Sequence, residues 1–386
     1  MFFPVPVPER QQGLLSKRKD INMFVNLLCP INTLGYGVVG FNIFRALHEA
    51  GHTVSLFPIN NPLRDQDVEG YKEHIDTIKK GLLNAKTYNH EAPSIRIWHQ
   101  HELDKFVGGA TRIGFPIFEL DRFTDLERHQ LESVDRLFVC SEWARGVIAA
   151  NGIDTPTDVI PLGFDPEIFY VDQEAKKRRP YYSANTTTFI NVGKWEVRKG
   201  HNELLEAFNR AFTPEDDVKL IMMNHNPFLG PAGNKKWESK YLSSPMGSKI
   251  KIQPRVKTQN EMRELFNQVD FGVFPSHAEG WNLEILELMA CGAPCIATNY
   301  SGHTEFLNSS NSLLVETNGI ESAQDGVWFH GQGNWCSFDV NELVKQMKYA
   351  HQIKQDPSPT ALSSTCVDAA KNFTWQKTAE KIAKIL

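Results

Sequence analysis

The chain has 386 residues, and at roughly 150 residues per domain this length predicts two large domains or three small ones. Hydrophobic residues make up 41% of the chain and charged residues 23%, which supplies a buried core and excludes a disordered protein. The net charge of −5 disfavours nucleic acid or an anionic membrane as the main partner, although a local basic cleft fits this total.

The N-terminus and the cysteines indicate a cytoplasmic protein. Residues 1–22 contain Pro4, Pro6 and Pro8 where a signal peptide needs an unbroken apolar segment, so we expect a flexible extension there. No run of 18 or more apolar residues occurs, so no integral membrane segment is expected. The six cysteines form no C-x-x-C pair, which favours reduced, buried thiols over a zinc site or disulfides.

The first half of the chain alternates strand-like and helical segments. Residues 24–28 are typical of a buried strand, and Val39, Ile43 and Leu47 then follow at helical spacing up to Gly51. Further strands are expected over 53–57, 95–98, 112–115, 137–139 and 158–160, with a helix over 142–150 that Ser141 caps. This alternation predicts a parallel sheet.

A second alternation begins after a polar tract between residues 165 and 187 that suits an interdomain connection. Strands are expected over 188–192, 220–223, 249–252, 271–274 and 294–298, with helices around Leu204 and over 260–268 and 283–291. The chain is therefore predicted to be α/β, with two doubly wound Rossmann-like domains that face a cleft. Ligands are expected beyond the carboxyl ends of the strands.

A glycine motif follows the first strand. Gly35, Tyr36, Gly37 and Gly40 lie in a G-x-G-x-x-G string, which alone suggests NAD. The second strand, however, ends without the acid that would hold a ribose hydroxyl. The alternatives are a flexible loop whose N–H groups face a phosphate or an acceptor sugar, and a plain tight turn.

Two carboxylates eight positions apart form the sharpest pattern. Glu279 precedes a predicted helix, and Glu287 lies about one turn inside it. Glu287 could accept hydrogen bonds from two vicinal hydroxyls as a charged group, while the helix N-terminus faces a diphosphate and Glu279 reaches a sugar. A solvated helix acid is the alternative for Glu287, but Leu286 and Leu288 surround it with apolar neighbours.

This stretch resembles the E-x7-E signature of the group-one family of retaining nucleotide-sugar glycosyltransferases of the GT-B fold. That pattern reads E-G-F-G-L-P-x-L-E-A-M-A-x-G-x-P. Further similarity over residues 138–143, 159–169, 192–200 and 301–305 extends the resemblance to nearly the whole chain. It implies an acceptor-side domain over 23–170, a donor domain over 186–371 and a final helix over 372–386 that crosses back to the first domain.

The resemblance also implies roles for single residues. Glu287 would hold the donor ribose, Glu279 would lie by the transferred sugar, and Lys194 and Lys199 would grip the diphosphate in place of a divalent cation. The other donor-binding positions that it implies are Gly193, Val256, Gly280, Trp281, Asn282 and Leu283. The sequence departs from the family at Lys194 (usually Arg), Asn282 (glycine) and Glu284 (proline), which affects donor identity more than reaction class.

Other polar motifs give weaker indications of a functional site. The Asp65-Gln66-Asp67 string and the segment 99–102 could mimic metal sites, but neither has further ligands at suitable spacing, so no metal is expected. His99 at a strand end and Glu119 after the fourth strand are expected to line the cleft as acceptor or sugar contacts. For Glu119 the alternative is a loop acid beside Arg122.

The sequence therefore predicts a metal-independent retaining glycosyltransferase, with a UDP- or GDP-sugar as substrate, no cofactor, and a small-molecule or glycan acceptor. The hypotheses that stay open are a nucleic-acid base or protein as acceptor, a non-catalytic nucleotide-sugar binding protein, and an NAD-linked oxidoreductase that uses Gly35, Gly37 and Gly40. The sequence does not identify the sugar, the nucleotide or the acceptor.

Overall fold

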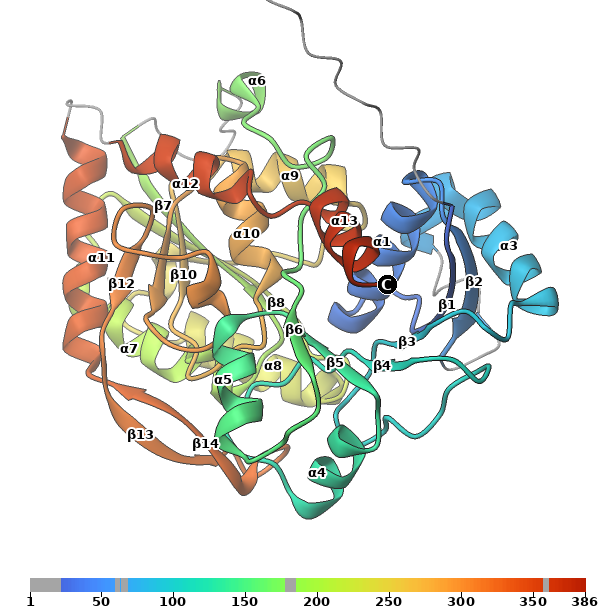
Figure 1. The fold of residues 1–386 in the computed structure, drawn as a ribbon. Coiled ribbons are helices and arrows are strands. Elements are labelled where there is room, and N and C mark those ends of the chain that lie inside the picture. Colours follow the sequence, from blue (N-terminus) through green and yellow to red (C-terminus); the bar gives the residue numbers. More distant parts are fainter. Residues whose placement is uncertain (1–21, 60–62, 64–68, 178–184, 357–360) are drawn as a thin grey trace, which may run out of the picture.

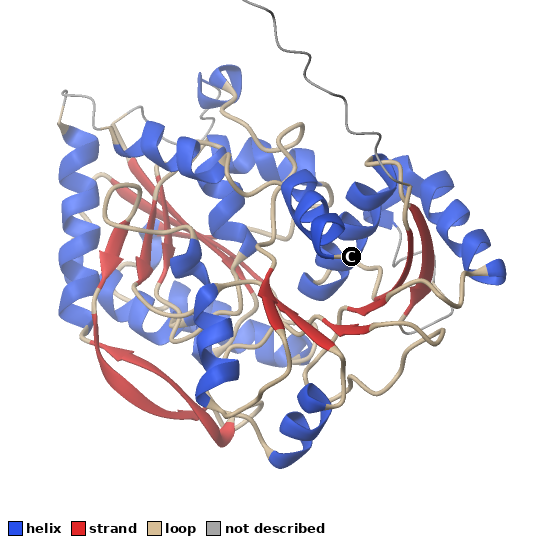
Figure 2. Cartoon of the chain, in the orientation of Figure 1, coloured by secondary structure: helices blue, strands red, loops and turns tan. Residues whose placement is uncertain are grey.

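The computed structural model describes residues 22–59, 63, 69–177, 185–356 and 361–386. The expected extension over residues 1–22 falls outside this part of the chain except for Asn22, and so does the Asp65-Gln66-Asp67 string. Two parallel sheets, each with helices on both faces, form the body of the molecule (Figures 1 and 2). This arrangement confirms the prediction of two doubly wound α/β domains.

The N-terminal domain is built on a six-stranded sheet of order β2-β1-β3-β4-β5-β6. Its strands are β1 (Phe24–Cys29), β2 (Thr53–Pro58), β3 (Ser94–Arg96), β4 (Arg112–Gly114), β5 (Arg136–Val139) and β6 (Thr157–Val159). Its helices are α1 (Gly35–Glu49), η1 (Glu69–His74), α3 (Ile75–Asn84), η2 (Ala85–Thr87), α4 (Asp125–Glu132) and α5 (Glu142–Ala150). Ser141 caps α5 as predicted, because its hydroxyl accepts a hydrogen bond from the Ala144 N–H.

The C-terminal domain has a second six-stranded sheet of order β12-β11-β10-β7-β8-β9. Its strands are β7 (Thr187–Gly193), β8 (Val218–Asn224), β9 (Ile250–Ile252), β10 (Phe271–Phe274), β11 (Cys295–Thr298) and β12 (Leu313–Val315). The helices are α6 (Gln173–Lys177), η3 (Val197–Lys199), α7 (His201–Ala211), α8 (Gly230–Leu242), η4 (Gly247–Lys249), α9 (Gln259–Asn267), α10 (Leu283–Ala290), η5 (Gly302–Glu305), α11 (Val340–Gln355), α12 (Leu362–Ala370) and α13 (Trp375–Ile385).

The strand order places the functional loops. In the second sheet β7 lies between β10 and β8, so the connections that leave β7 and β10 run from neighbouring strand ends. Because both strands are parallel, their carboxyl ends meet at the same edge, which is where open α/β sheets bind ligands. The residues that follow Gly193 and Phe274 are thereby brought together.

Two features differ from the sequence prediction. Gly35, Tyr36 and Gly37 form the first turn of α1 rather than a flexible loop. An added Cβ at Gly37 would lie 2.2 Å from the Asn32 side chain, and one at Gly40 would lie 2.5 Å from the Pro30 carbonyl oxygen, so these glycines let α1 pack against the turn before it. The second difference is an antiparallel hairpin, β13 (Thr317–Gln324) and β14 (His330–Phe338), which the sequence analysis did not predict.

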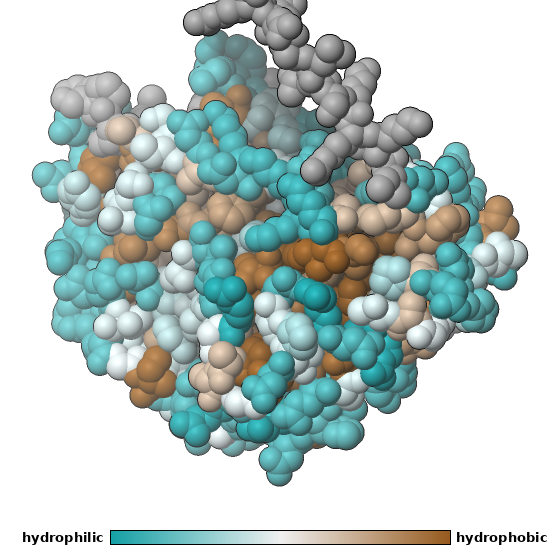
Figure 3. Space-filling view, viewed as in Figure 1, coloured by the Kyte–Doolittle hydropathy of each residue, from teal (hydrophilic) through white to brown (hydrophobic). Residues whose placement is uncertain are grey.

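The two domains share an apolar core. One cluster of buried residues includes β1 and α1 of the first domain together with β10 and α10 of the second. On the face in Figure 3, hydrophobic residues gather in the middle of the molecule and hydrophilic residues cover most of the remainder. Among the described residues, no helix combines the length and the apolar character needed to cross a bilayer.

The last helix, α13, lies beside α1 of the first domain (Figure 1). The hydroxyl of Thr378 donates to the Pro161 carbonyl oxygen at 2.7 Å, and the Phe164 N–H donates to the Phe373 carbonyl oxygen at 3.1 Å. Gly163 lies directly under this crossing, since a Cβ there would meet the carbonyl carbon of Thr374 at 2.2 Å. The chain end is therefore attached to the N-terminal domain at a point where only glycine fits.

We expect Gly163→Ala to lower the thermal unfolding midpoint, because the added methyl overpacks the α13 crossing at a cost of about 1–3 kcal/mol. Gly146→Ala is the matched control. A Cβ at Gly146 would meet nothing within 4 Å, and alanine in this exposed turn of α5 is favoured by about 0.5–1 kcal/mol, so this variant should unfold at a higher temperature. Equal midpoints for the two variants would contradict the tight crossing.

Candidate active site

Two loops meet at the carboxyl ends of β7 and β10. The first passes from Gly193 through η3 to Gly200, and the second runs from Pro275 to the start of α10. Gly200 has a φ of +68°, and an added Cβ would lie 1.9 Å from the Pro275 carbonyl oxygen. Glycine is required at this position both for the backbone conformation and for the close approach of the loops.

Four charged side chains are packed inside this contact, and we call them the charge cluster: Glu196, Arg198, Lys199 and Glu279. The Lys199 Nζ lies 2.7 Å from Glu279 Oε1, and the Arg198 Nη1 lies 3.0 Å from Glu279 Oε2. The Arg198 Nη2 also lies 2.9 Å from Glu196 Oε2. Each side chain is at most 10% exposed, so two cations and two anions balance one another away from solvent.

The cluster keeps Glu279 ionised. Burial alone would raise the pKa of this carboxyl, but the ammonium of Lys199, the guanidinium of Arg198 and the Ser276 hydroxyl, which donates at 2.7 Å, hold its pKa well below the ordinary range. The Glu279 carboxylate in turn raises the pKa of Lys199 against the effect of burial. Removal of one member would leave an uncompensated buried charge, which is strongly destabilising.

Two further charges lie at the edge of the cluster. The Lys194 Nζ is 2.7 Å from Glu196 Oε1, and its side chain is 42% exposed. Glu119, from the N-terminal domain, places its Oε1 3.7 Å from the Arg198 Nη2. Lys194 is therefore the most accessible cation of this group, and the cleft contributes charge from both domains.

His99 and Tyr36 line the N-terminal side. Burial, His101 and Lys194 together lower the pKa of His99 to about 4 against the opposing effect of Glu102, so the imidazole is neutral at pH 7. The ring centroids of His99 and Tyr36 are 4.6 Å apart, and the Tyr36 hydroxyl donates to the Ile117 carbonyl oxygen at 2.7 Å. Tyr36 thus belongs to the cleft wall, whereas Gly35 and Gly37 only shape the start of α1.

Glu287 lies on α10, apart from the charge cluster. Burial and the like charge of Glu284 raise the pKa of Glu287 well above its ordinary value. Glu287 is only half-buried, however, so its role as a charged acceptor for the ribose stays a prediction. Burial raises the pKa of Tyr71 in the N-terminal domain, and the negative charge of Glu287 adds to this effect against Arg255.

The turn between Glu279 and α10 is pressed against the N-terminal domain. A Cβ at Gly280 would lie 2.6 Å from Ile117 Cγ2, and the Cys140 thiol donates to the Gly280 carbonyl oxygen at 3.0 Å. Trp281 is buried against Phe306 and Phe373. The turn therefore joins the two domains.

Asn282 is the N-cap of α10 and has a φ of +78°, a conformation that glycine adopts more readily. Its side chain is buried, and neither its amide nitrogen nor its amide oxygen has a hydrogen-bond partner. A strained backbone and two unpaired polar atoms at the start of a helix indicate a position that is kept for a ligand. Leu283 begins α10, and Val256 packs against the shared core.

Comparison with known proteins shows a similarity between the C-terminal domain and one protein family. Residues 186–327 match the family model described as Glycosyl transferases group 1. This part of the C-terminal domain is therefore similar to glycosyltransferases of that family. The match includes Lys194, Lys199, Glu279 and Glu287, so the charge cluster lies inside the glycosyltransferase region.

Relatives extend the similarity. A D-inositol 3-phosphate glycosyltransferase of Stackebrandtia nassauensis is 26% identical over 234 residues, which are 58% of this chain and 47% of that protein. The chain therefore aligns with about half the length of that relative. The sucrose-phosphate synthase of Thermosynechococcus elongatus superposes with a TM-score of 0.69 at 16% identity, over 94% of this chain and 98% of the other. Anabaena HepE, solved in complex with UDP and glucose, superposes with a TM-score of 0.67 at 16% identity over 94% and 99% of the two chains. These superpositions establish the GT-B fold.

The structure adds residues that the sequence analysis did not assign. Arg198 bonds both carboxylates of the charge cluster and donates to the Ala278 carbonyl oxygen at 2.5 Å, and the Ser301 hydroxyl accepts from the Glu279 N–H at 2.8 Å. Arg198 and Glu196 lie within the stretch 192–200 that resembles the glycosyltransferase family, but the resemblance implied no role for either residue. The sequence signal that could have pointed to them is a pair of opposite charges in a loop directly after a buried strand.

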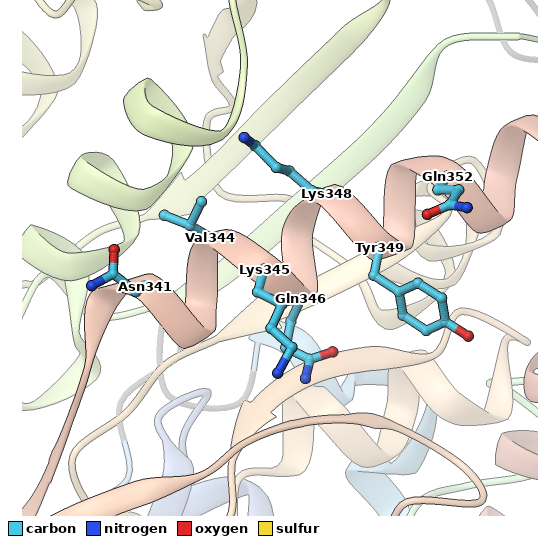
Figure 4. A pocket seen from close by; sticks show the side chains of 7 residues that line it. All are labelled: Asn341, Val344, Lys345, Gln346, Lys348, Tyr349 and Gln352. Carbon is cyan, nitrogen blue, oxygen red and sulfur yellow. The ribbon is translucent and has the colours of Figure 1, made fainter.

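Neither a metal site nor the surface pocket adds to the candidate active site. Within the described part of the chain no three His, Cys, Asp or Glu side chains are grouped so that they could hold a metal ion. A surface pocket lies on α11, and Figure 4 shows its lining side chains spread along that single helix. These residues are Asn341, Val344, Lys345, Gln346, Lys348, Tyr349 and Gln352, none of which belongs to the charge cluster.

We expect Lys199→Met to destabilise the protein by about 3–5 kcal/mol, because Arg198 then faces both Glu279 and Glu196 and the charge cluster is left with one excess buried negative charge. Lys194→Met removes an exposed partner of Glu196 and should cost at most about 1 kcal/mol. Thermal and urea unfolding of the two variants measure this difference. A Lys199→Met protein as stable as Lys194→Met would contradict the buried pairing.

Proposed function

We propose that the protein is a metal-independent retaining glycosyltransferase that moves a sugar from a nucleoside diphosphate sugar to a hydroxyl acceptor. The observation that carries the proposal is the charge cluster at the carboxyl ends of β7 and β10, with Lys194 accessible beside it. The buried cations of the cluster are already paired with Glu196 and Glu279. Lys194 is exposed, so its ammonium can turn from Glu196 toward the negative charge of a bound diphosphate.

The donor site is assigned as follows. Lys194 and Lys199 bind the diphosphate together with the N–H groups at the start of α10, and these dipoles and cations take the place of a divalent ion. Glu287 holds the ribose hydroxyls. The unpaired amide of Asn282 offers one donor and one acceptor to the transferred sugar.

The chemistry exchanges one bond at the sugar. The bond between the anomeric carbon and the diphosphate oxygen breaks, and a bond to the acceptor oxygen forms on the same face. The acceptor proton passes to the leaving diphosphate, since the motif contains no side chain placed as a covalent nucleophile. Lys194 and Lys199 stabilise the charge that develops on the leaving group. Glu279 keeps Lys199 and Arg198 in position through its two ion pairs.

The acceptor side is assigned to the N-terminal domain. His99, neutral at pH 7, and Glu119 reach the cleft opposite the donor site and are proposed as acceptor or sugar contacts. Tyr36 fixes the wall behind them. A cytoplasmic location is part of the proposal, and the burial of all six cysteines fits a reducing compartment.

Thermal shift and donor hydrolysis in EDTA, with UDP-, GDP-, ADP- and CMP-sugars and with NADH, test the function. We expect a shift of several degrees and slow hydrolysis with one nucleotide sugar, because a ligand that binds only the folded state raises its stability. Glu287→Ala should weaken that donor at least tenfold through the lost ribose contact. Glu279→Ala should abolish turnover.

Glu380→Ala, on the exposed surface of α13, is the control for these variants and should behave as the unaltered protein. A response to NADH alone would replace the proposal with an oxidoreductase. Nucleotide-sugar binding without any turnover would indicate a binding protein, and unchanged donor affinity in Glu287→Ala would remove the ribose assignment.

A further inference from the structure

Two exposed aromatic side chains meet beside the candidate active site, and we call them the aromatic rim: Phe228 and Trp328. Phe228 lies between β8 and α8 and is 60% exposed, while Trp328 lies at the tip of the β13–β14 hairpin and is 44% exposed. Their ring centroids are 5.8 Å apart in an edge-to-face arrangement. Two segments that are distant in sequence therefore present large aromatic rings to solvent at one place.

The hairpin tip is built to hold Trp328 outward. The Asp325 Oδ1 accepts hydrogen bonds from the backbone N–H groups of Val327, Trp328 and Phe329 at 2.8, 2.7 and 2.8 Å. Phe329 turns inward and packs on the buried Trp335, with ring centroids 5.5 Å apart. The backbone hydrogen bonds to Asp325 and the packing of Phe329 thus hold the tip in place, so Trp328 is exposed although its backbone is ordered.

The hairpin is also fixed to the opposite domain. The N–H of Asn334 on β14 donates to Asp121 Oδ1 of the N-terminal domain at 2.8 Å, and the Asn334 amide donates to the same carboxylate at 3.1 Å. The hairpin therefore spans both domains, and its tip keeps one position relative to the cleft.

The rim continues into the cleft. The Lys194 Nζ lies 5.8 Å from the ring centroid of Phe228 and 2.7 Å from Glu196 Oε1 of the charge cluster. In the N-terminal domain, the positive charge of Lys194 contributes to the lowered pKa of His99. The His99 ring stacks with the His101 ring at a centroid distance of 5.3 Å. Aromatic rings of both domains therefore lie near Lys194.

We propose that Phe228 and Trp328 form an acceptor subsite that binds a saccharide ring. This inference rests on the proposed function, since the donor fills the inner site and the acceptor must approach from the rim. A pyranose has an apolar face of C–H groups that packs on an aromatic ring, and hydroxyls at its edge that can stay in contact with water. The exposed apolar surface at the tip is limited to the two rings and Val327, which is small for a face that inserts into a membrane.

The test measures saccharide binding of the full chain on an array of immobilised oligosaccharides, and initial rates with the best of these as acceptor. We expect Trp328→Ala and Phe228→Ala each to weaken binding and to raise the acceptor KM at least tenfold. Hydrolysis of the donor by water and the donor KM should stay within twofold. Trp328→Tyr, which keeps an aromatic face, should restore most of the binding.

Tyr349→Ala removes an equally exposed aromatic ring from α11 and should leave every value unchanged. The subsite is overturned if the unaltered protein binds no saccharide on the array, or if the two rim variants bind as it does. A rise in donor KM instead would assign the rim to the donor base. If the unaltered protein neither binds nor hydrolyses any nucleotide sugar, the proposed function itself fails, and this readout is independent of the array.

Discussion

The Glu279 carboxylate, held between Lys199 and Arg198 inside the protein, is the interaction on which the rest of the site depends. A buried carboxylate without these partners would take up a proton, and the two cations would lose the group that positions them. The arrangement leaves Lys199 rigid and Lys194 accessible. A charged ligand can therefore be held with little reorganisation, which is what stabilisation of a developing charge requires.

The site is complete only when both domains are present. The Gly280 turn rests on Ile117, and Arg255 of the second domain donates to the Thr33 carbonyl oxygen of the first at 2.6 Å. The final helix attaches the chain end to the first domain, so the two halves are joined at several points. Movement between the domains would therefore change access to the charge cluster.

Long, regular patterns were predictable from the sequence, and contacts between distant segments were not. The buried strand at 188–192 and the capped helix at 142–150 follow from local periodicity and from Ser141. The β13–β14 hairpin is largely exposed and polar, so it lacked the alternation that marks a strand. The raised pKa of Glu287 depends on its surroundings in the folded chain and on Glu284, which local periodicity does not reveal.

The affinity for UDP and GDP, measured by calorimetry in EDTA, tests most directly whether the charge cluster and Lys194 form a diphosphate site. We predict that one of these nucleotides binds without a divalent cation, that Lys194→Met weakens its affinity at least tenfold, and that Lys194→Arg keeps the affinity. Lys345→Met, on the exposed surface of α11, should have no effect. Binding that requires a divalent cation, or a Lys194→Met protein that binds as tightly as Lys345→Met, would contradict the account.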